Sequence, residues 1–205
     1  MTATTAIPTG DAGTARPPVT RWRPGGRWVL ALLLVELALL GAVNLLHFPL
    51  SVPAQRALTG ETYLDMCSFC SAGEEHRILT AFGDAGRAAQ LRLLISIDIA
   101  IPVISAVFGA SALAYLSRRR WLLALPIGAM LLDFAENAAI ADAVWRYPDP
   151  ASGIAGVLSG LKALAYAATV IAIAGAAAAA WWRRRSRDRV VSSARPAGPA
   201  QRGRR

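Results

Sequence analysis

The stretch "IPVISAVFGASALAYLSRRRWLLALPIGAMLLDF" (Ile101–Phe134) decides the fold of this chain. It contains two apolar runs that are separated only by the residues SRRR (Ser117–Arg120). With their flanking residues the runs extend over Leu91–Leu116 and Trp121–Val144, and each reaches the roughly 20 residues that an α-helix needs to cross a bilayer. Because SRRR is long enough only for a tight turn, we expect an antiparallel pair of membrane-spanning helices.

Two further apolar runs of spanning length, Trp28–Leu46 and Ile154–Trp182, lie on either side of this pair. The sequence therefore predicts an all-α fold, an integral membrane four-helix bundle with a short extramembrane helix in its first outer loop. The composition agrees, since 55% hydrophobic and 17% charged residues make the chain too apolar for a typical soluble domain.

The membrane domain is expected over residues 27–182, with its outer loop at 47–90. The flanking segments 1–26 and 183–205 are rich in Pro, Gly, Thr, Ala and Arg, so we expect disordered tails there. The apolar part of the first span is longer than the core of a usual signal peptide, which favours an uncleaved anchor.

The arginines predict the orientation of the bundle. Sixteen of them lie before the first span, between spans two and three, or after span four. The opposite side carries five, namely Arg56, Arg77, Arg87, Arg92 and Arg146. Basic residues accumulate on the cytoplasmic side of membrane proteins, so both termini are predicted to be cytoplasmic. The bias toward Arg over Lys and toward Ala is typical of a bacterial genome of high GC content, so we expect the membrane to be a bacterial plasma membrane.

The formal net charge of +9 could also indicate a nucleic-acid partner, but its distribution argues against one. The basic residues form clusters beside apolar runs rather than a folded basic face with a recognition motif. We therefore expect membrane lipids as partners and no nucleic acid, and the sequence leaves the oligomeric state open.

The outer loop contains one helix signal. Ser71 and Glu74 form the capping-box pattern S-x-x-E, which predicts a short helix starting there. Its apolar residues Ile78, Leu79 and Phe82 would share one face, and Gly83 is expected to end the helix.

The same loop carries both cysteines, in the sequence CSFC (Cys67 and Cys70). A local disulfide or inert thiols are the favoured interpretation, and a redox pair is the second, since C-x-x-C can be either on an oxidising side of a membrane. A zinc site with His76 and His47 is the third, but this spacing fits none of the usual zinc patterns. We expect neither a metal nor a cofactor.

Five charged residues lie more than one helical turn inside the ends of the predicted spans: Glu36, Asp98, Asp133, Glu136 and Lys162. Each costs at least about 2.5 kcal/mol to place in a bilayer core, so such residues usually face protein or a wet cavity. At about 1.5 Å per residue, four of them lie roughly 9 to 14 Å below the outer ends of their spans. Glu36 lies about 16 Å down span one, nearer the midplane.

Helical geometry predicts which of these residues lie on the same helix face. Asp133, Glu136 and Asn137 are at positions i, i+3 and i+4, so they share one helix face. Pro102 has no N–H for the carbonyl of Asp98, which leaves that oxygen free at the level of the carboxylate.

In span four the motif GxxxG (Gly156 and Gly160) is expected to allow close approach of a neighbouring helix. Lys162 would then reach the acids of its neighbours.

Four acids against one lysine are not neutral as a group, which favours a function over simple adhesion between helices. The candidate ligand-binding residues are Asp98, Asp133, Glu136, Asn137, Lys162 and Glu36. The ligand would be a proton, a small cation or a lipophilic amine. Two alternatives remain at this stage: an acid–base membrane enzyme that acts on a lipid-like substrate, and a structural or accessory membrane subunit.

Several of these features occur together in one known pattern. "FGDAGR" (Phe82–Arg87) is followed by Asp98 with Pro102, by "DFAEN" (Asp133–Asn137) and by Lys162. The arrangement resembles a family of small four-span bacterial membrane proteins with no assigned activity, over about Leu79 to Tyr166. The family pattern has a tyrosine where this chain has Gln90, and no cysteines in the loop. The resemblance implies a fold and a polar cluster, and no reaction.

Overall fold

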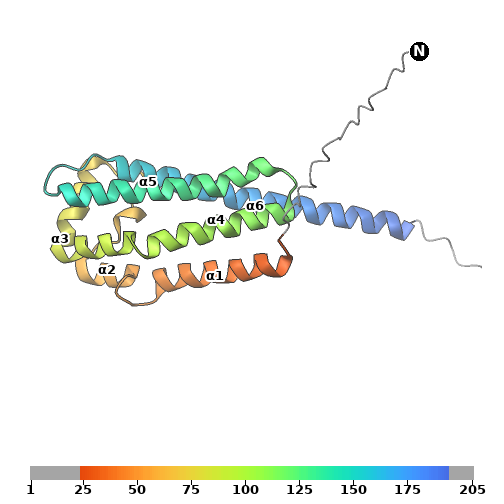
Figure 1. The fold of residues 1–205 in the computed structure, drawn as a ribbon, viewed down its shortest axis with the longest axis horizontal. Coiled ribbons are helices and arrows are strands. Elements are labelled where there is room, and N and C mark those ends of the chain that lie inside the picture. Colours follow the sequence, from red (N-terminus) through yellow and green to blue (C-terminus); the bar gives the residue numbers. More distant parts are fainter. Residues whose placement is uncertain (1–23, 194–205) are drawn as a thin grey trace, which may run out of the picture.

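The computed structural model describes residues 24–193, with side chains up to residue 186. Its elements are helical: α1 (Gly26–Leu45), α2 (Val52–Thr59), the short 3₁₀ helix η1 (Leu64–Met66), α3 (Ala72–Leu94), α4 (Ile97–Leu116), the 3₁₀ helix η2 (Arg120–Leu123), α5 (Ala124–Arg146) and α6 (Ile154–Ser193) (Figure 1). No strand occurs between residues 24 and 193, and the all-α prediction is confirmed.

Four long helices run side by side in the bundle. In Figure 1, α1, α4, α5 and α6 lie along a common direction, with α4 between α1 and α5. Helix α5 packs on α4 and α6, whereas α1 packs on α4. Within the described part of the chain, four helical segments are long and apolar enough to cross a membrane, as expected for a multi-pass membrane protein.

The start of α1, the turn between α4 and α5, and the far end of α6 lie at the same end of the bundle (Figure 1). We call this end, which carries Arg118–Arg120 and Arg183–Arg185, the basic end. Segments α2, η1 and α3 cover the opposite end, and residues 51–94 are called the cap below.

Two span boundaries differ from the predictions. The second spanning helix begins at Ile97 rather than at Leu91, because the chain breaks at Ser96. The Ser96 hydroxyl donates to the carbonyls of Arg92 and Leu93 and so satisfies the end of α3. Helix α6 continues past Trp182 to Ser193, into a segment for which disorder was predicted. The remaining predicted tail residues, 1–23 and 194–205, lie outside the described part of the chain.

The cap is more structured than the single short helix predicted for it. Ser71 does begin α3, and its Oγ accepts from the Glu74 N–H at 3.2 Å. Gly83 also interrupts α3 as expected, with φ 57° and ψ −173°, a conformation that a residue without Cβ adopts easily. The helix resumes after the kink and reaches Leu94. Helix α2, which begins at the N-cap Ser51, was not predicted.

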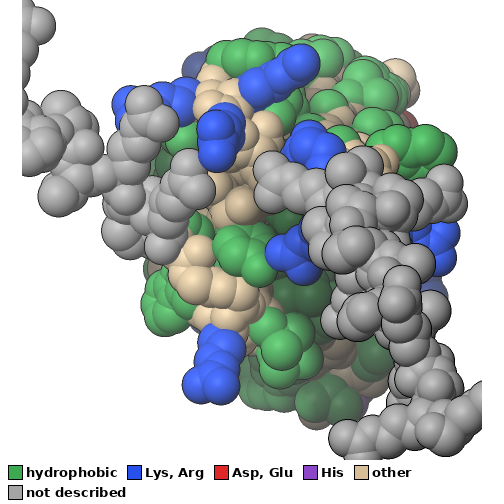
Figure 2. All heavy atoms as spheres, turned by 90° about the vertical axis from the view of Figure 1, so that its right-hand side faces the viewer, with side chains coloured by type: hydrophobic (Ala, Val, Ile, Leu, Met, Phe, Trp, Pro, Cys, Tyr) green, Lys and Arg blue, Asp and Glu red, His purple; other side chains and the backbone are tan. Residues whose placement is uncertain are grey.

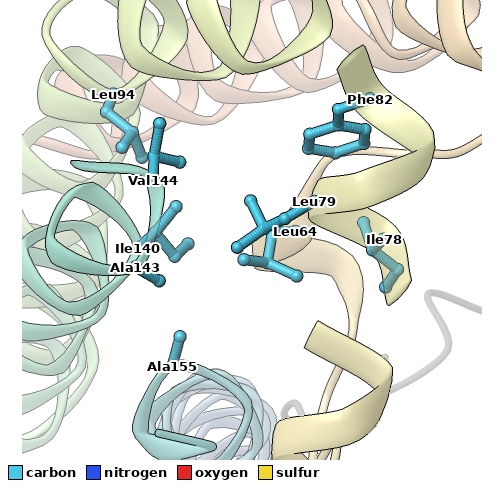
Figure 3. Packing of buried hydrophobic residues seen from close by; sticks show 9 residues of the cluster. All are labelled: Leu64, Ile78, Leu79, Phe82, Leu94, Ile140, Ala143, Val144 and Ala155. Atoms are coloured by element: carbon cyan, nitrogen blue, oxygen red, sulfur yellow. The ribbon is translucent and has the colours of Figure 1, made fainter. Parts of the chain in front are cut away.

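The hydrophobic core joins the cap to the bundle (Figure 3). The predicted apolar face of α3 is buried, as expected, and packs with residues of η1, α5 and α6. The cluster consists of Leu64, Ile78, Leu79, Phe82, Leu94, Ile140, Ala143, Val144 and Ala155. This packing fixes the cap on the helix ends that carry the polar residues.

Candidate functional site

Lys162 of α6 and the acids of α5 meet inside the bundle. The Lys162 Nζ lies 3.5 Å from Asp133 Oδ1, and it also forms an ion pair with Glu136 Oε2. Glu136 is fully buried and Asp133 is nearly so. The spacing i, i+3 on α5 therefore does present both carboxylates to the helix that carries the lysine.

Tyr166 belongs to the same group, although we did not predict it. Its hydroxyl donates to Asp133 Oδ2 at 2.9 Å. It lies four residues after Lys162, so both side chains share one face of α6. This spacing is a signal that could have identified it from the sequence.

Helix α4 joins the cluster through its backbone and its carboxylate. Asn137 Nδ2 donates to the backbone carbonyl of Asp98 at 3.0 Å, and this is the oxygen that Pro102 leaves without an intrahelical donor. The Asp98 Oδ2 atom is buried and has no hydrogen-bond partner among the described residues. A carboxylate of α4 thus remains unsatisfied next to the ion pairs of α5 and α6.

Asp65 of η1 is the second residue that the sequence analysis missed. Its backbone carbonyl accepts from the Ser159 hydroxyl of α6 at 2.7 Å, and its Oδ1 is buried without a hydrogen-bond partner in the described residues. Burial raises the pKa of the Asp65 carboxyl above its ordinary value, while the positive charge of Lys162 opposes this increase. Because η1 is only three residues long, no helical periodicity in the sequence could have placed Asp65 here.

The CSFC turn holds this loop on α6. Cys67 and Cys70 form a disulfide, and the Phe69 N–H donates to the Gly156 carbonyl at 2.7 Å. A Cβ on Gly156 would overlap the backbone of Cys70, and one on Gly160 would overlap the Phe69 ring. The predicted close approach at GxxxG is therefore made by the cap, not by a neighbouring helix.

His76, which the zinc interpretation required, stacks on the Tyr147 ring instead, with a centroid distance of 5.6 Å. Both thiols are in the disulfide, so neither is available to that site as a thiolate.

Glu36 lies apart from the other predicted residues. Its Oε1 accepts from the Ser105 hydroxyl of α4, and no ion pair joins it to Lys162 in the described residues. The structure thus brings Asp98, Asp133, Glu136, Asn137 and Lys162 together and leaves Glu36 nearer the middle of α1.

A cavity of about 480 Å³ extends from the charged residues around Lys162 to the level of Glu36. Its walls come mainly from α1, α4 and α6, and most of its lining side chains are apolar. Leu37 and Leu40 of α1 and Val170 of α6 line it and are exposed on the outside of the bundle, so the cavity opens between these two helices. Its ionisable lining residues are Glu36, Tyr63, Asp65, Asp98, Asp133, Lys162 and Tyr166.

Buried Glu75 of α3 fixes the start of α6. Its Oε1 accepts from the Gly156 N–H at 2.6 Å and its Oε2 from the Gly153 N–H at 3.1 Å. A carboxylate at a helix N-terminus is favoured by the free N–H groups and by the helix dipole. This contact sets the position of α6 relative to the cap, and with it the depth of Lys162.

Comparison with known proteins finds no matching family, no matching curated protein and no matching solved structure. The family resemblance noted in the sequence therefore stays a prediction.

Proposed function

We propose that this multi-pass membrane protein binds an amphipathic amine, a lipophilic cation, in the cavity between α1 and α6. The observation that carries the proposal is the excess of carboxylates around Lys162 at the capped end of a mainly apolar cavity.

The charges around Lys162 favour a cationic ligand. Its ammonium group is already paired with Asp133 and Glu136. Asp98 and Asp65 also line the cavity, and each has a buried oxygen without a hydrogen-bond partner among the described residues. Unpaired buried acceptors are costly, and a ligand N–H or ammonium group would satisfy them.

The size and walls of the cavity favour an amine with an apolar body over a bare ion. A volume of about 480 Å³ falls in the range of small-molecule sites. A small inorganic cation would leave most of the apolar wall without a partner, whereas a lipophilic tail would fill it.

The mouth of the cavity supports entry from the bilayer. Its rim carries the exposed apolar residues Leu37, Leu40 and Val170. An amphiphile that has partitioned into the membrane would reach the carboxylates by moving sideways between α1 and α6, without crossing the cap.

Asp98→Asn tests the proposal in the full-length chain, reconstituted in phosphatidylcholine nanodiscs with dodecylammonium, which carries three N–H donors, as the probe. The amide keeps the shape of the side chain and removes its charge. Since a hydrogen bond to a charged group contributes about 1.5 to 3 kcal/mol, the affinity should fall about ten- to one-hundredfold. Asp142→Asn is the matched control, because Asp142 is exposed and pairs with Arg146 outside the cavity.

Dodecanol provides the second control, because it has the tail of the probe without its charge. Equal binding of dodecanol and the ammonium probe, or an unchanged affinity in Asp98→Asn, contradicts the proposal. Asp65→Asn removes a second carboxylate of the cavity, which belongs to the cap rather than to α4. A similar loss of affinity in both variants would therefore come from the lost charge and not from a structural defect of α4.

The proposal also places the protein in a bacterial plasma membrane with both termini in the cytoplasm. It is supported by the arginines at the basic end, where the described chain begins and ends. Alkaline phosphatase fused after Arg205 should be inactive and a fluorescent protein fused there should fluoresce; the opposite pair of results contradicts this orientation.

A further inference from the structure

The basic end of the bundle contains a cavity that the amine proposal does not use. It has a volume of about 550 Å³ and lies between the turn after α4 and the distal part of α6. Figure 2 looks onto this end and shows Lys and Arg side chains spaced among apolar ones. The polar side chains that line the cavity are Tyr115, Ser117, Arg118, Arg119, Arg183 and Arg184.

The four arginines of this cavity have no acidic partner in the side chains described between residues 24 and 186. All ion pairs in that part of the chain lie elsewhere, in the cap, near the end of α5 or around Lys162. Arginines gathered from two segments repel one another unless an anion lies between them. A guanidinium group can donate two parallel hydrogen bonds to two oxygens of one phosphate, which makes phosphate a suitable anion.

A second cavity continues from the first along α6. It has a volume of about 290 Å³ and shares four lining residues with the first, Leu116, Ser117, Arg119 and Arg183. Its other wall is made of small residues of α6 from Ala172 to Ala179. A Cβ on Gly175 would meet nothing within 4 Å, so the space beside this glycine is open.

The direction of this second cavity matches that of a lipid chain. From Arg183 back to Ala172 the helix rises about 16 Å toward the middle of the bundle. Trp121, Trp181 and Trp182 are exposed at the arginine level, where tryptophans mark the headgroup region of a bilayer. The arginines therefore lie at headgroup depth. The second cavity, which is called the groove below, lies at acyl-chain depth.

We propose that these two cavities form a binding site for one anionic phospholipid. The phosphate lies among Arg118, Arg119, Arg183 and Arg184, and one acyl chain lies in the groove beside Gly175. Basic pockets between membrane helices are known to hold anionic headgroups. The site is independent of the amine site, which uses the opposite end of the bundle.

The headgroup is tested with the double variant Arg119→Gln/Arg183→Gln of the full-length chain in detergent. Native mass spectrometry measures the affinity for dioleoylphosphatidylglycerol, for dioleoylphosphatidylcholine and for inorganic phosphate. We expect the native chain to prefer phosphatidylglycerol, and the variant to lose at least about tenfold in that affinity. The control is Arg56→Gln/Arg92→Gln, which removes the same charge from exposed positions of the cap.

The groove is tested separately with Gly175→Leu, which places a side chain in the space that is open around a Cβ at this position. Phosphatidylglycerol binding should weaken in this variant and stay unchanged in Gly41→Leu, where an added Cβ also meets nothing within 4 Å. Equal binding of phosphatidylcholine, or phosphatidylglycerol binding that survives both Gly175→Leu and the arginine variant, overturns the proposal. Binding of inorganic phosphate that equals that of the lipid overturns it in favour of a free-phosphate site.

Discussion

The capped end and the basic end of this bundle are held together by different means. At the capped end, large side chains such as Leu79, Phe82 and Ile140 are buried, and long-range hydrogen bonds join the cap to α6. Toward the basic end the contacts between helices involve small residues. Gly109 of α4 lies so close to Pro126 of α5 that a Cβ would overlap it.

This difference follows from the surroundings of each end. Water drives large apolar side chains into a core, and the cap packs as a small soluble domain does. Within lipid that driving force between helices is lost, so small residues and close approach replace it. The polar cluster lies where the two kinds of packing meet, because η1 of the cap brings Asp65 against helices that carry charge in the membrane.

The largest expected effect comes from removing the positive charge at this junction. Lys162→Met leaves Asp133 and Glu136 buried without their counter-charge, so the variant should be destabilised by about 3 to 5 kcal/mol. Thermal unfolding in detergent measures the change.

The double variant Lys162→Met/Glu136→Gln should recover part of that loss, because one of the two unpaired charges is removed with its partner. If Lys162→Met alone is as stable as the native chain, the ion pairs do not hold α5 and α6 together.

The second prediction concerns how the cap holds α6. Glu75→Ala leaves the N–H groups of Gly153 and Gly156 without their acceptor and should cost about 2 to 3 kcal/mol. Glu74→Ala is the neighbouring control; it removes an exposed ion pair with Arg77 and should change the midpoint of thermal unfolding far less. Equal effects of the two substitutions would show that Glu75 does not fix the start of α6.

The sequence predicted the features that depend on a local period. The apolar runs identified four spanning helices, and the spacing of Asp133, Glu136 and Asn137 placed them on one face. Pro102 identified the carbonyl that Asn137 binds, since a missing N–H is a property of the proline itself.

The features that were missed depend on contacts between distant segments. Glu74 and Glu75 are adjacent and chemically alike, yet Glu74 is half-exposed while Glu75 is buried against α6. Nothing in the local sequence separates them, because the difference arises from where the cap docks. Asp65 was missed for the same reason, and the GxxxG motif was assigned to a helix although a loop fills it.

The third prediction concerns the disulfide in the CSFC turn of the cap. The double variant Cys67→Ser/Cys70→Ser should lose less than about 2 kcal/mol, because a disulfide that closes so short a loop constrains the unfolded chain only slightly. The hydrogen bonds from Phe69 to Gly156 and from Ser159 to Asp65 remain in the variant. Thermal unfolding with and without a reductant checks this value, and Ser68→Ala is the control that keeps both cysteines. A loss as large as that of Lys162→Met would mean that the disulfide, rather than these contacts, holds the cap.

The smallest expected effect is a change in how stability depends on pH. Burial raises the pKa of Asp65 in the folded chain above its value in the unfolded chain, against the opposing charge of Lys162. The folded state therefore holds the Asp65 proton up to a higher pH than the unfolded state does. As the pH rises from the unfolded pKa through the folded pKa, the contribution of this group to the free energy of unfolding is lost. Asp65→Asn cannot lose that proton, so its stability should decline less than that of the native chain over this range.

The measurement compares thermal unfolding of both proteins in detergent from about pH 4 to about pH 8. Asp98, Asp133, Glu136 and Lys162 are present in both proteins, so the difference between them reports the loss of the Asp65 carboxyl. Asp142→Asn, at an exposed position of α5, should run parallel to the native chain. If the stability of Asp65→Asn also changes with pH as that of the native chain does, the cap does not bury this carboxylate. The junction between the two kinds of packing then lies outside η1.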